Sequence, residues 1–402
     1  FTCADVLAGI RSCTLPVTLS TEGADQSVTG TAEDRADNTA GVTVGNISID
    51  KTAPIITASR SPVANSYGWN NGAVEVSFIC DDALSGVDSC TGSMTLGDEG
   101  AGQSVTGLAT DKANNSASNM VGGINIDLTA PTITHTIIPD ANSNGWHNAD
   151  VIVRFEASET LSGIDGASTQ DMVFTLEGSG QTTGDIAFTD KAGNSASDSV
   201  SGISIDKTAP SVSISGIASG AEFIWGDSIP AAVCNAADGL SGMDSCILTM
   251  VPNNGNVGEH TISAKATDKA GNVATTSISY TIKAWTLRGF YQPVDMGTVL
   301  NTVKGGQTVP MKFEVFAGTA EKTSISDISS FTQKKISCSN INTAMTDDVE
   351  LTTTGNTALR YDSTSGQFIA NWKTPTGQAG TCWEAKMTSL DGSIIVGFFK
   401  LK

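Results

Sequence analysis

The pentapeptide Asp-Lys-Thr-Ala-Pro at residues 50–54 recurs almost unchanged at residues 127–131 and in full at residues 206–210. Two further motifs keep the same phase. Leu-Ser-Gly stands at 84–86, 161–163 and 240–242, and Asp-Lys-Ala-x-Asn stands at 111–115, 190–194 and 268–272. A related turn, Asp-Arg-Ala-Asp-Asn, stands at 34–38. A fixed period of 77 to 79 residues, carried by several motifs, predicts a tandem array of small domains.

These landmarks divide the chain into four repeats and a remainder that matches none of them. The predicted domains are a partial repeat at 1–49, complete repeats at 50–126, 127–205 and 206–283, and a separate C-terminal domain at 284–402.

The first repeat begins late. Cys3 aligns with Cys80 and Phe1 with Phe78, so the equivalent of residues 50–77 is missing. Either earlier repeats of a longer protein precede this chain, or a neighbouring subunit supplies the missing strands in a head-to-tail filament. We favour the first explanation, because a sandwich that loses core strands exposes apolar faces and unpaired edges.

Alternation of apolar and polar residues predicts the fold. Residues 74–78 read Val-Glu-Val-Ser-Phe, and residues 151–155 read Val-Ile-Val-Arg-Phe. A period of two indicates strands with one buried face, and turns rich in Pro, Gly, Asn and Asp separate them. The prediction is all-β: tandem immunoglobulin-like sandwiches in an extended rod, followed by a C-terminal β-sandwich domain. Trp69, Trp146 and Trp225 are interpreted as core residues.

Six of the eight cysteines occur as pairs in the phase of the repeat, and the other two remain as a fourth pair in the C-terminal domain. The third repeat has alanine or glycine at both corresponding places, so a pair is kept or lost together. This pattern predicts disulfides and hence an oxidising, extracellular compartment, whereas a zinc site is disfavoured because no C-x-x-C occurs. The predicted pairs are Cys3–Cys13, Cys80–Cys90, Cys234–Cys246 and Cys338–Cys382.

The charge balance excludes several classes of function. The net charge is -20, and residues 284–402 are nearly neutral, so the repeats carry the excess of acid. Such a surface disfavours nucleic-acid binding, and no apolar run is long enough for a membrane span. Hydrolase and nucleotide-binding motifs are absent, and His135, His147 and His260 fall at different phases of the repeat. We therefore expect no enzymatic activity.

The acidic residues suggest calcium, which prefers carboxylate and carbonyl oxygens. Three aspartates begin the linkers, and others lie in turns about 16 residues earlier. The first hypothesis is therefore that one calcium ion binds between them at each repeat junction. A second candidate is the loop that contains Asp81, Asp82 and Asp88. The alternative is that these side chains only cap turns, and we favour it because no complete calcium loop is present. The predicted junction ligands are Asp50, Asp111, Asp127, Asp190, Asp206 and Asp268.

Together with Gly-Trp-Asn-Asn at 68–71, these motifs make residues 1–283 resemble the bacterial Ig-like repeats of large secreted and cell-surface proteins. Residues 284–402 resemble a small bacterial domain named after its P-x-K-F motif, here Pro-Met-Lys-Phe at 310–313. The first resemblance implies an extracellular stalk, an adhesin extender or a surface-layer part. The second implies a terminal domain without an established catalytic activity.

The functional prediction is a non-enzymatic extracellular protein: a bacterial surface stalk, adhesin segment or filament subunit. Its expected partners are other copies of itself, other surface proteins or glycans. The alternative is a carbohydrate- or substrate-binding accessory region of a larger secreted hydrolase. Exposed aromatic side chains on one face would favour that alternative, and Trp285, Trp372 and Trp383 are the candidates.

Overall fold

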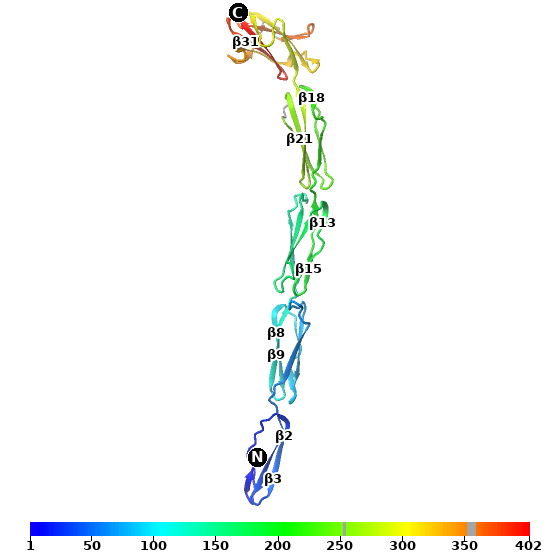
Figure 1. Cartoon of the computed structure of the whole chain (residues 1–402), viewed down its shortest axis with the longest axis vertical. Coiled ribbons are helices and arrows are strands. Elements are labelled where there is room, and N and C mark those ends of the chain that lie inside the picture. The colour runs from blue at the N-terminus through cyan, green and yellow to red at the C-terminus, as the bar shows by residue number, and fades with distance from the viewer. Residues whose placement is uncertain (252–254, 352–358) are drawn as a thin grey trace. The chain divides into compact units, whose positions relative to one another are not determined.

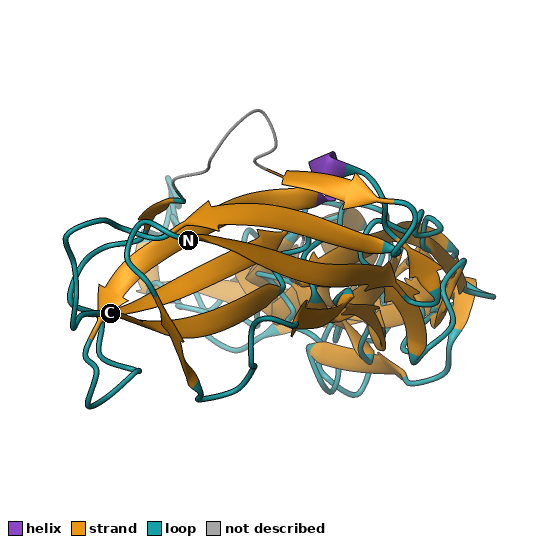
Figure 2. Ribbon diagram, turned by 90° about the horizontal axis from the view of Figure 1, so that it is seen from above, coloured by secondary structure: helices purple, strands orange, loops and turns teal. Residues whose placement is uncertain are grey.

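The computed structural model describes residues 1–251, 255–351 and 359–402. Its regular secondary structure is almost wholly β-strand (Figure 2), and the helix in the described part is one 3-10 turn, η1 (Ile325–Asp327). The all-β prediction is therefore confirmed. The chain divides into two compact units, Phe1–Asp140 with Ala149–Ser204 and Ala141–Asn148 with Ile205–Lys402.

Within the described residues, no helix has the length and apolarity needed to cross a membrane.

The partial repeat is a single antiparallel sheet in the order β1-β2-β3. Its apolar side chains lie open to solvent, with Val42 58% and Val44 50% exposed. The ring of Phe1 lies against Gly30, just as the ring of Phe78 lies against Gly107 in the next repeat. The strands are β1 (Ile10–Cys13), β2 (Gly23–Asp34) and β3 (Thr39–Ile49).

The repeat at 50–126 is a complete small sandwich (Figure 1). One sheet has the order β4-β5-β7 and the other β6-β8-β9. Along β5, Val74 and Val76 are fully buried while Ile79 is 71% exposed, as the alternation predicts. Val74 and Val76 pack against Ile124 and Ile126 of the opposite sheet. The strands are β4 (Ile55–Ser61), β5 (Val74–Asp81), β6 (Val87–Cys90), β7 (Met94–Leu96), β8 (Gly100–Asp111) and β9 (Ser116–Ile126).

The next two repeats vary this arrangement, and no described sheet crosses a predicted repeat boundary. In residues 127–205 the strands are β10 (Thr132–Ile138), β11 (Val151–Ser158), β12 (Thr169–Phe174), β13 (Gly178–Thr182), β14 (Ile186–Thr189), β15 (Ser195–Asp198) and β16 (Ser201–Ile205). In residues 206–283 they are β17 (Ser211–Ser215), β18 (Ala221–Ile224), β19 (Val233–Ala237), β20 (Met243–Val251), β21 (Gly258–Asp268) and β22 (Val273–Lys283).

The C-terminal domain holds a larger aromatic core between two five-stranded sheets. The P-x-K-F motif lies on β25, where Met311 and Phe313 are fully buried and Lys312 alternates to the other face. Phe313 stacks on Phe368 with ring centroids 5.3 Å apart. The strands are β23 (Thr286–Tyr291), β24 (Leu300–Val303), β25 (Thr308–Ala317), β26 (Ala320–Glu321), β27 (Ile328–Ile336), β28 (Val349–Glu350), β29 (Leu359–Asp362), β30 (Gln367–Lys373), β31 (Cys382–Ser389) and β32 (Ile394–Leu401).

The four disulfides join the predicted partners: three pairs follow the phase of the repeat, and the fourth lies in the C-terminal domain. Cys80 on β5 and Cys90 on β6 belong to different sheets of one sandwich. Cys234 on β19 and Cys246 on β20 likewise join two sheets. Each of these two bonds therefore staples a thin sandwich across the loop that contains Leu-Ser-Gly.

The interpretation of the repeat tryptophans as core residues is wrong for Trp69 and Trp146, whereas Trp225 is partly buried and packs against the core clusters of its own repeat and of the C-terminal domain. Trp69 and Trp146 are half-buried in a loop between the first two strands of their repeats. Trp225 follows β18 and packs edge-to-face on Trp285, with ring centroids 5.3 Å apart. The tight turn before Trp69 uses Gly68, a glycine with positive φ, and places the ring at the end of the sandwich.

Removal of the Cys80–Cys90 disulfide tests how much this bond contributes to the stability of its repeat. The double variant Cys80→Ala/Cys90→Ala frees a loop of 10 residues, and loss of this constraint on the unfolded chain costs about 3 kcal/mol. Hydrogen–deuterium exchange read by mass spectrometry should show amide protection lowered in residues 74–126 and unchanged in residues 206–283. Unchanged protection in both repeats would contradict a stabilising role for the bond.

Candidate metal centre

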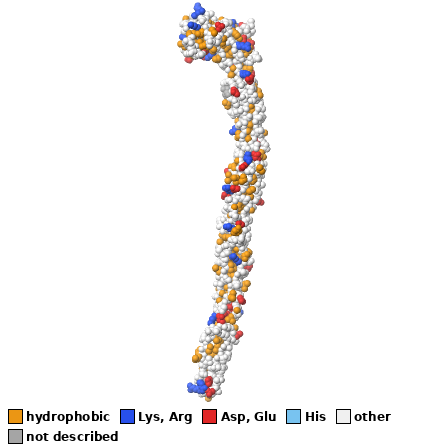
Figure 3. Space-filling model, in the orientation of Figure 1, with side chains coloured by type: hydrophobic (Ala, Val, Ile, Leu, Met, Phe, Trp, Pro, Cys, Tyr) orange, Lys and Arg blue, Asp and Glu red, His pale blue; other side chains and the backbone are white. Residues whose placement is uncertain are grey.

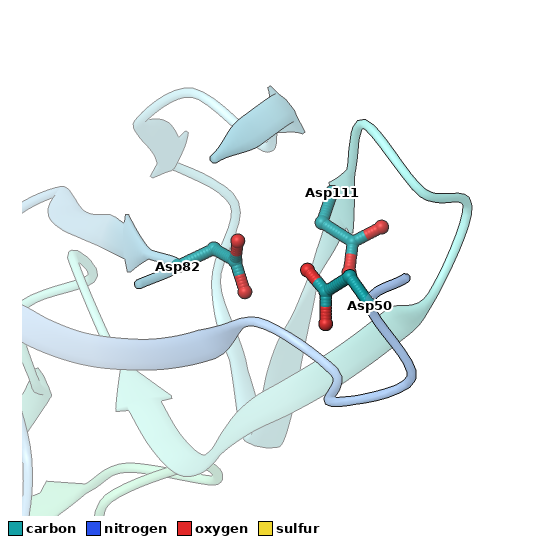
Figure 4. Close-up of side chains that lie close together, drawn as sticks. All are labelled: Asp50, Asp82 and Asp111. Carbon is teal, nitrogen blue, oxygen red and sulfur yellow. The ribbon is translucent and has the colours of Figure 1, made fainter. Parts of the chain in front are cut away.

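Three aspartates converge at one end of the sandwich formed by residues 50–126 (Figure 4). Asp50 precedes β4, Asp82 follows β5, and Asp111 is the last residue of β8. One carboxylate oxygen from each lies within 4.8 Å of those of the other two. Asp111 is 1% exposed, while Asp50 and Asp82 are half-buried.

Asp82 is held by the loop that it caps. Its Oδ1 accepts hydrogen bonds from the backbone N–H of Leu84 at 3.3 Å and of Gly86 at 2.6 Å. Gly86 has a φ of 79°, a left-handed conformation that glycine adopts without a steric penalty. The Lys112 ammonium lies 3.5 Å from the position that a Cβ on Gly86 would occupy, which is an ordinary contact distance, so the positive φ is the reason for glycine here.

Asp111 and Asp50 are tied to each other through Asn115. The two oxygens of Asp111 accept from the Asn115 N–H at 2.8 Å and from its Nδ2 at 2.7 Å. The same amide donates to the carbonyls of Asp50 and Thr52, each at 3.3 Å. Asp50 itself accepts from the N–H of Thr52 at 3.0 Å and of Ser85 at 2.9 Å.

The repeat at 206–283 builds the same group from Asp206, Asp238 and Asp268, again within 4.8 Å. Asp206 accepts from Ser241 N–H at 3.0 Å, and Asp268 from Asn272 N–H at 2.8 Å. Asp206 and Asp268 are almost fully buried.

The repeat at 127–205 departs at one position. Asp127 and Asp190 are buried and keep their hydrogen bonds to Ser162 and Asn194. Glu159 stands in place of the third aspartate and caps the loop through Gly163 N–H at 2.6 Å. Within the described residues, the close three-carboxylate group occurs in the other two complete repeats.

Hydrogen bonding from Ser85 lowers the pKa of Asp50 below its ordinary value of 3.8. For Asp238, burial raises the pKa, but hydrogen bonds from the backbone of Gly242 and Leu240 outweigh burial and leave the pKa below 3.8. Both groups are therefore carboxylates at neutral pH, and their charges face those of the neighbouring aspartates.

The predicted pairing across repeat junctions is wrong. The sequence prediction brings Asp34 to Asp50, but strand β3 separates them. Glu33 pairs with Thr39 at one end of the β2–β3 hairpin, and Gly23 pairs with Ile49 at the other. Eleven residues of strand span about 36 Å, so each linker aspartate instead meets the turn aspartate of its own repeat.

The two predicted sites also merge into one. Asp82 of the second candidate loop joins the cluster, whereas Asp81 and Asp88 are exposed and lie outside it. The sequence carries a usable signal for this, because an acid precedes Leu-Ser-Gly by two residues at 82, 159 and 238.

The histidines do not come together. His135 contacts Asp198, with Nδ1 and Oδ2 2.7 Å apart, and His260 stacks on Tyr280 with ring centroids 5.0 Å apart. His147 lies in the separate loop before β11.

No family model matches the chain, and no curated protein matches it. Among solved structures, it is similar to an adhesin of an Antarctic bacterium, described as Ca²⁺-stabilized and ice-binding. That match has 14% identity and a TM-score of 0.26, over 87% of this chain and 98% of the other. The cadherin domains 1–5 of protocadherin gamma B2 match at 10% identity and a TM-score of 0.27, over 95% and 87% of the two chains. A tetra-tandem repeat from the extending region of a large adhesion protein matches at 16% identity and a TM-score of 0.18, over 94% and 83%. Because these TM-scores are low, the function is inferred from the chain's own residues.

Low pH should remove the stabilising effect of the clustered aspartates. Because the pKa of Asp238 is lowered on folding, its stabilising effect is complete well above pH 3.8 and is lost as pH falls through the folded pKa. Calorimetry should show the wild type melting higher than Asp238→Asn at pH 6, with the difference vanishing as the pH falls below 3.8 and through the folded pKa. The matched control Asp244→Asn, at an exposed residue of the same repeat, should show no pH-dependent difference. A difference between wild type and Asp238→Asn that does not change with pH would contradict this assignment.

Proposed function

We propose that the chain is a non-enzymatic, load-bearing segment of an extracellular bacterial protein, a stalk or adhesin extender. In this proposal residues 1–283 are bacterial Ig-like repeats and residues 284–402 are a P-x-K-F-type domain. The observation that carries it is that the backbone enters each complete sandwich at one end and leaves it at the other.

Residues 50–126 illustrate this path. Asp50, where the chain enters, bonds Ser85 and lies beside Asp111. At the exit, the Asp127 N–H donates to the Asn70 carbonyl at 3.0 Å, beyond the end of β9. The eleven residues of β9 span about 36 Å between these ends. A unit with opposed termini adds length to a protein, which suits a spacer better than a compact catalytic domain.

Parallel pairing near the exit supports a mechanical role. In residues 206–283, β18 runs parallel to the last strand β22, and Ala221–Ile224 pair with Tyr280–Lys283. Pulling on the two termini loads these bonds together in shear, because tension acts along the strands while the bonds lie across them. Isolated parallel bridges occupy the same place in the other complete repeats, at Asn70–Ile126 and His147–Ile205.

The disulfides and the charge support an extracellular location. All eight cysteines are paired, which is typical of proteins that fold in an oxidising compartment. Acidic side chains keep an exposed, thin sandwich soluble, and Figure 3 shows charged groups distributed over the visible face. Other copies of the chain, surface proteins or glycans are the proposed partners.

The accessory carbohydrate-binding function receives no support from the aromatic residues. Trp285 is 5% exposed, and Trp372 is fully buried. Trp383 is half-buried, and its Nε1 donates to Thr381 Oγ1 at 2.8 Å. These three candidates therefore do not offer a flat exposed face on which a sugar ring could stack.

We further propose calcium at the clusters Asp50/Asp82/Asp111 and Asp206/Asp238/Asp268. Three carboxylates supply hard, anionic oxygens, and backbone carbonyls and water can complete the six to eight ligands that calcium takes. Each aspartate already accepts turn hydrogen bonds, so the caps position the ligands, and a divalent cation offsets their mutual repulsion.

If the repeats bear load, each complete repeat should unfold as a separate event under force. Stretching the full chain by atomic force microscopy should give separate unfolding peaks for the complete repeats. Adding a reductant should lengthen the steps of 50–126 and 206–283 by about 30–37 Å, because it releases loops of 10 and 12 residues whose ends the bonds hold 5.9 and 6.0 Å apart. The repeat at 127–205, which lacks cysteine, is the internal control. Smooth extension without peaks would contradict a load-bearing function.

Calcium should stabilise the clustered repeats. Adding CaCl₂ to chelator-treated protein should raise the melting temperature, and Asp82→Asn with Asp238→Asn should remove most of that increase. Asp5→Asn is the matched control, since Asp5 caps the equivalent loop of the partial repeat through Gly9 N–H at 2.8 Å but belongs to neither cluster. An equal increase in all variants would contradict these ligands, and no increase in the wild type would leave the clusters as turn caps only.

A further inference from the structure

One asparagine is oriented by its own loop and bonded to the next repeat. In the loop between β4 and β5, Asn65 Oδ1 accepts from the N–H of Tyr67 at 3.0 Å and of Trp69 at 3.1 Å. These bonds fix the amide, so its Nδ2 points outward. Nδ2 donates to the backbone carbonyls of Lys191 at 2.8 Å and of Ala192 at 3.3 Å. Both acceptors belong to the Asp-Lys-Ala-Gly-Asn turn of the following repeat.

The same contact recurs in the other compact unit. Asn142 Oδ1 accepts from the N–H of Asn144 at 2.9 Å and of Trp146 at 3.1 Å. Its Nδ2 donates to the Lys269 carbonyl at 2.8 Å, and Asn144 Nδ2 adds a second bond at 3.1 Å. Lys269 occupies the position of Lys191 in the next Asp-Lys-Ala-Gly-Asn turn. Two separately packed junctions thus use equivalent atoms on both sides.

The accepting turn is shaped for this contact. Asp190 Oδ1 takes the N–H groups of Gly193 and Asn194, which keeps these donors inside the turn and leaves the Lys191 and Ala192 carbonyls outside. Gly193 has a φ of 101°, and the Nδ2 of Asn71, another residue of the preceding repeat, lies 3.4 Å from the position that a Cβ on Gly193 would occupy. Gly271 has a φ of 96° and two asparagine amides at 3.8 and 4.0 Å.

The residue at the fourth position of each Asp-Lys or Asp-Arg turn differs between turns that contact a preceding asparagine loop and turns that do not. The turns at 190–194 and 268–272, which receive an asparagine loop, have glycine at the fourth position. The turns at 34–38 and 111–115 have Asp37 and Asn114 there. At the boundary with the C-terminal domain, which offers no such turn, the donor position is Ala221. That junction uses Trp225 against Trp285 instead, with Trp285 Nε1 donating to the Trp225 carbonyl at 2.9 Å.

We propose that the loop before the second long strand of a complete repeat is a docking site for the following repeat. Asn65 and Asn142 donate hydrogen bonds to the outward carbonyls of the Asp-Lys-Ala-Gly-Asn turn and thereby fix the orientation of one repeat against the next. Tyr67 adds a bond from its hydroxyl to Asp165 at 2.6 Å in the first joint. The partner is therefore another repeat of the same kind. The mechanical purpose of the joint rests on the proposed function, whereas its geometry does not.

The test uses the full chain and the variant Asn65→Asp. Aspartate keeps the oxygen that accepts from Tyr67 and Trp69, so the loop stays capped, but it lacks the donor and places a charge against two carbonyls. Spin labels are attached through a ketone-bearing unnatural residue at positions 108 and 173, which are 53% and 59% exposed and lie in neighbouring repeats. Electron double resonance then gives the distribution of distances between the labels, with all disulfides intact.

The wild type should give one narrow distribution, and Asn65→Asp should lose it. The matched control Asn142→Asp, which removes the same donor from the next joint, should leave this distribution narrow. A broad distribution in the wild type, or a narrow one in Asn65→Asp, would overturn the proposal. A narrow, Asn65-dependent distribution in a chain that extends smoothly under force would keep the docking site and remove its load-bearing role.

Discussion

The structure of each complete repeat depends on the hydrogen bonds of the linker aspartate. Asp50 accepts from Ser85, and Asp127 and Asp206 accept from Ser162 and Ser241. These bonds tie the incoming chain to the Leu-Ser-Gly loop, and the asparagine of the Asp-Lys turn ties it to the last hairpin through the Asp50, Asp127 or Asp206 carbonyl. A thin sandwich with few large core side chains is thereby closed at one end by polar contacts and, in two of the three repeats, joined between its sheets by a disulfide. The third repeat, which lacks the disulfide, keeps every one of these polar contacts.

The turn at 268–272 joins two properties of the array. Asp268 contributes to an acidic cluster, while the Lys269 carbonyl accepts hydrogen bonds from the asparagine loop of the preceding repeat. A cation at this cluster and the neighbouring repeat would thus contact adjacent residues of one turn. Binding of either is expected to order the turn and to favour the other, since the cost of ordering is then already met.

Patterns with a local physical cause could be predicted from the sequence. Alternation along Val74-Glu75-Val76 indicates a strand with one buried face, and cysteines kept or lost as pairs indicate their partners. The pairing of aspartates could not be predicted in this way, because Asp34 and Asp111 have the same local motif and only the length of β3 decides which of them meets Asp50. The position of the Trp69 side chain could not be predicted for a related reason. An aromatic residue after a turn can lie either in the core or on the surface at the end of the sandwich. The docking by Asn65 could not be predicted although Asn65 and Asn142 keep the phase of the repeat, because the atoms they bind are backbone carbonyls, which no residue type identifies.

Small-angle X-ray scattering of the full chain is the most direct test of the proposed spacer function. A compact globule of 402 residues has a radius of gyration of about 21 Å. A spacer built of repeats with opposed termini should give a value at least about twice as large, with a cross-section that matches a single sandwich. A radius of gyration near that of the compact globule would contradict this function.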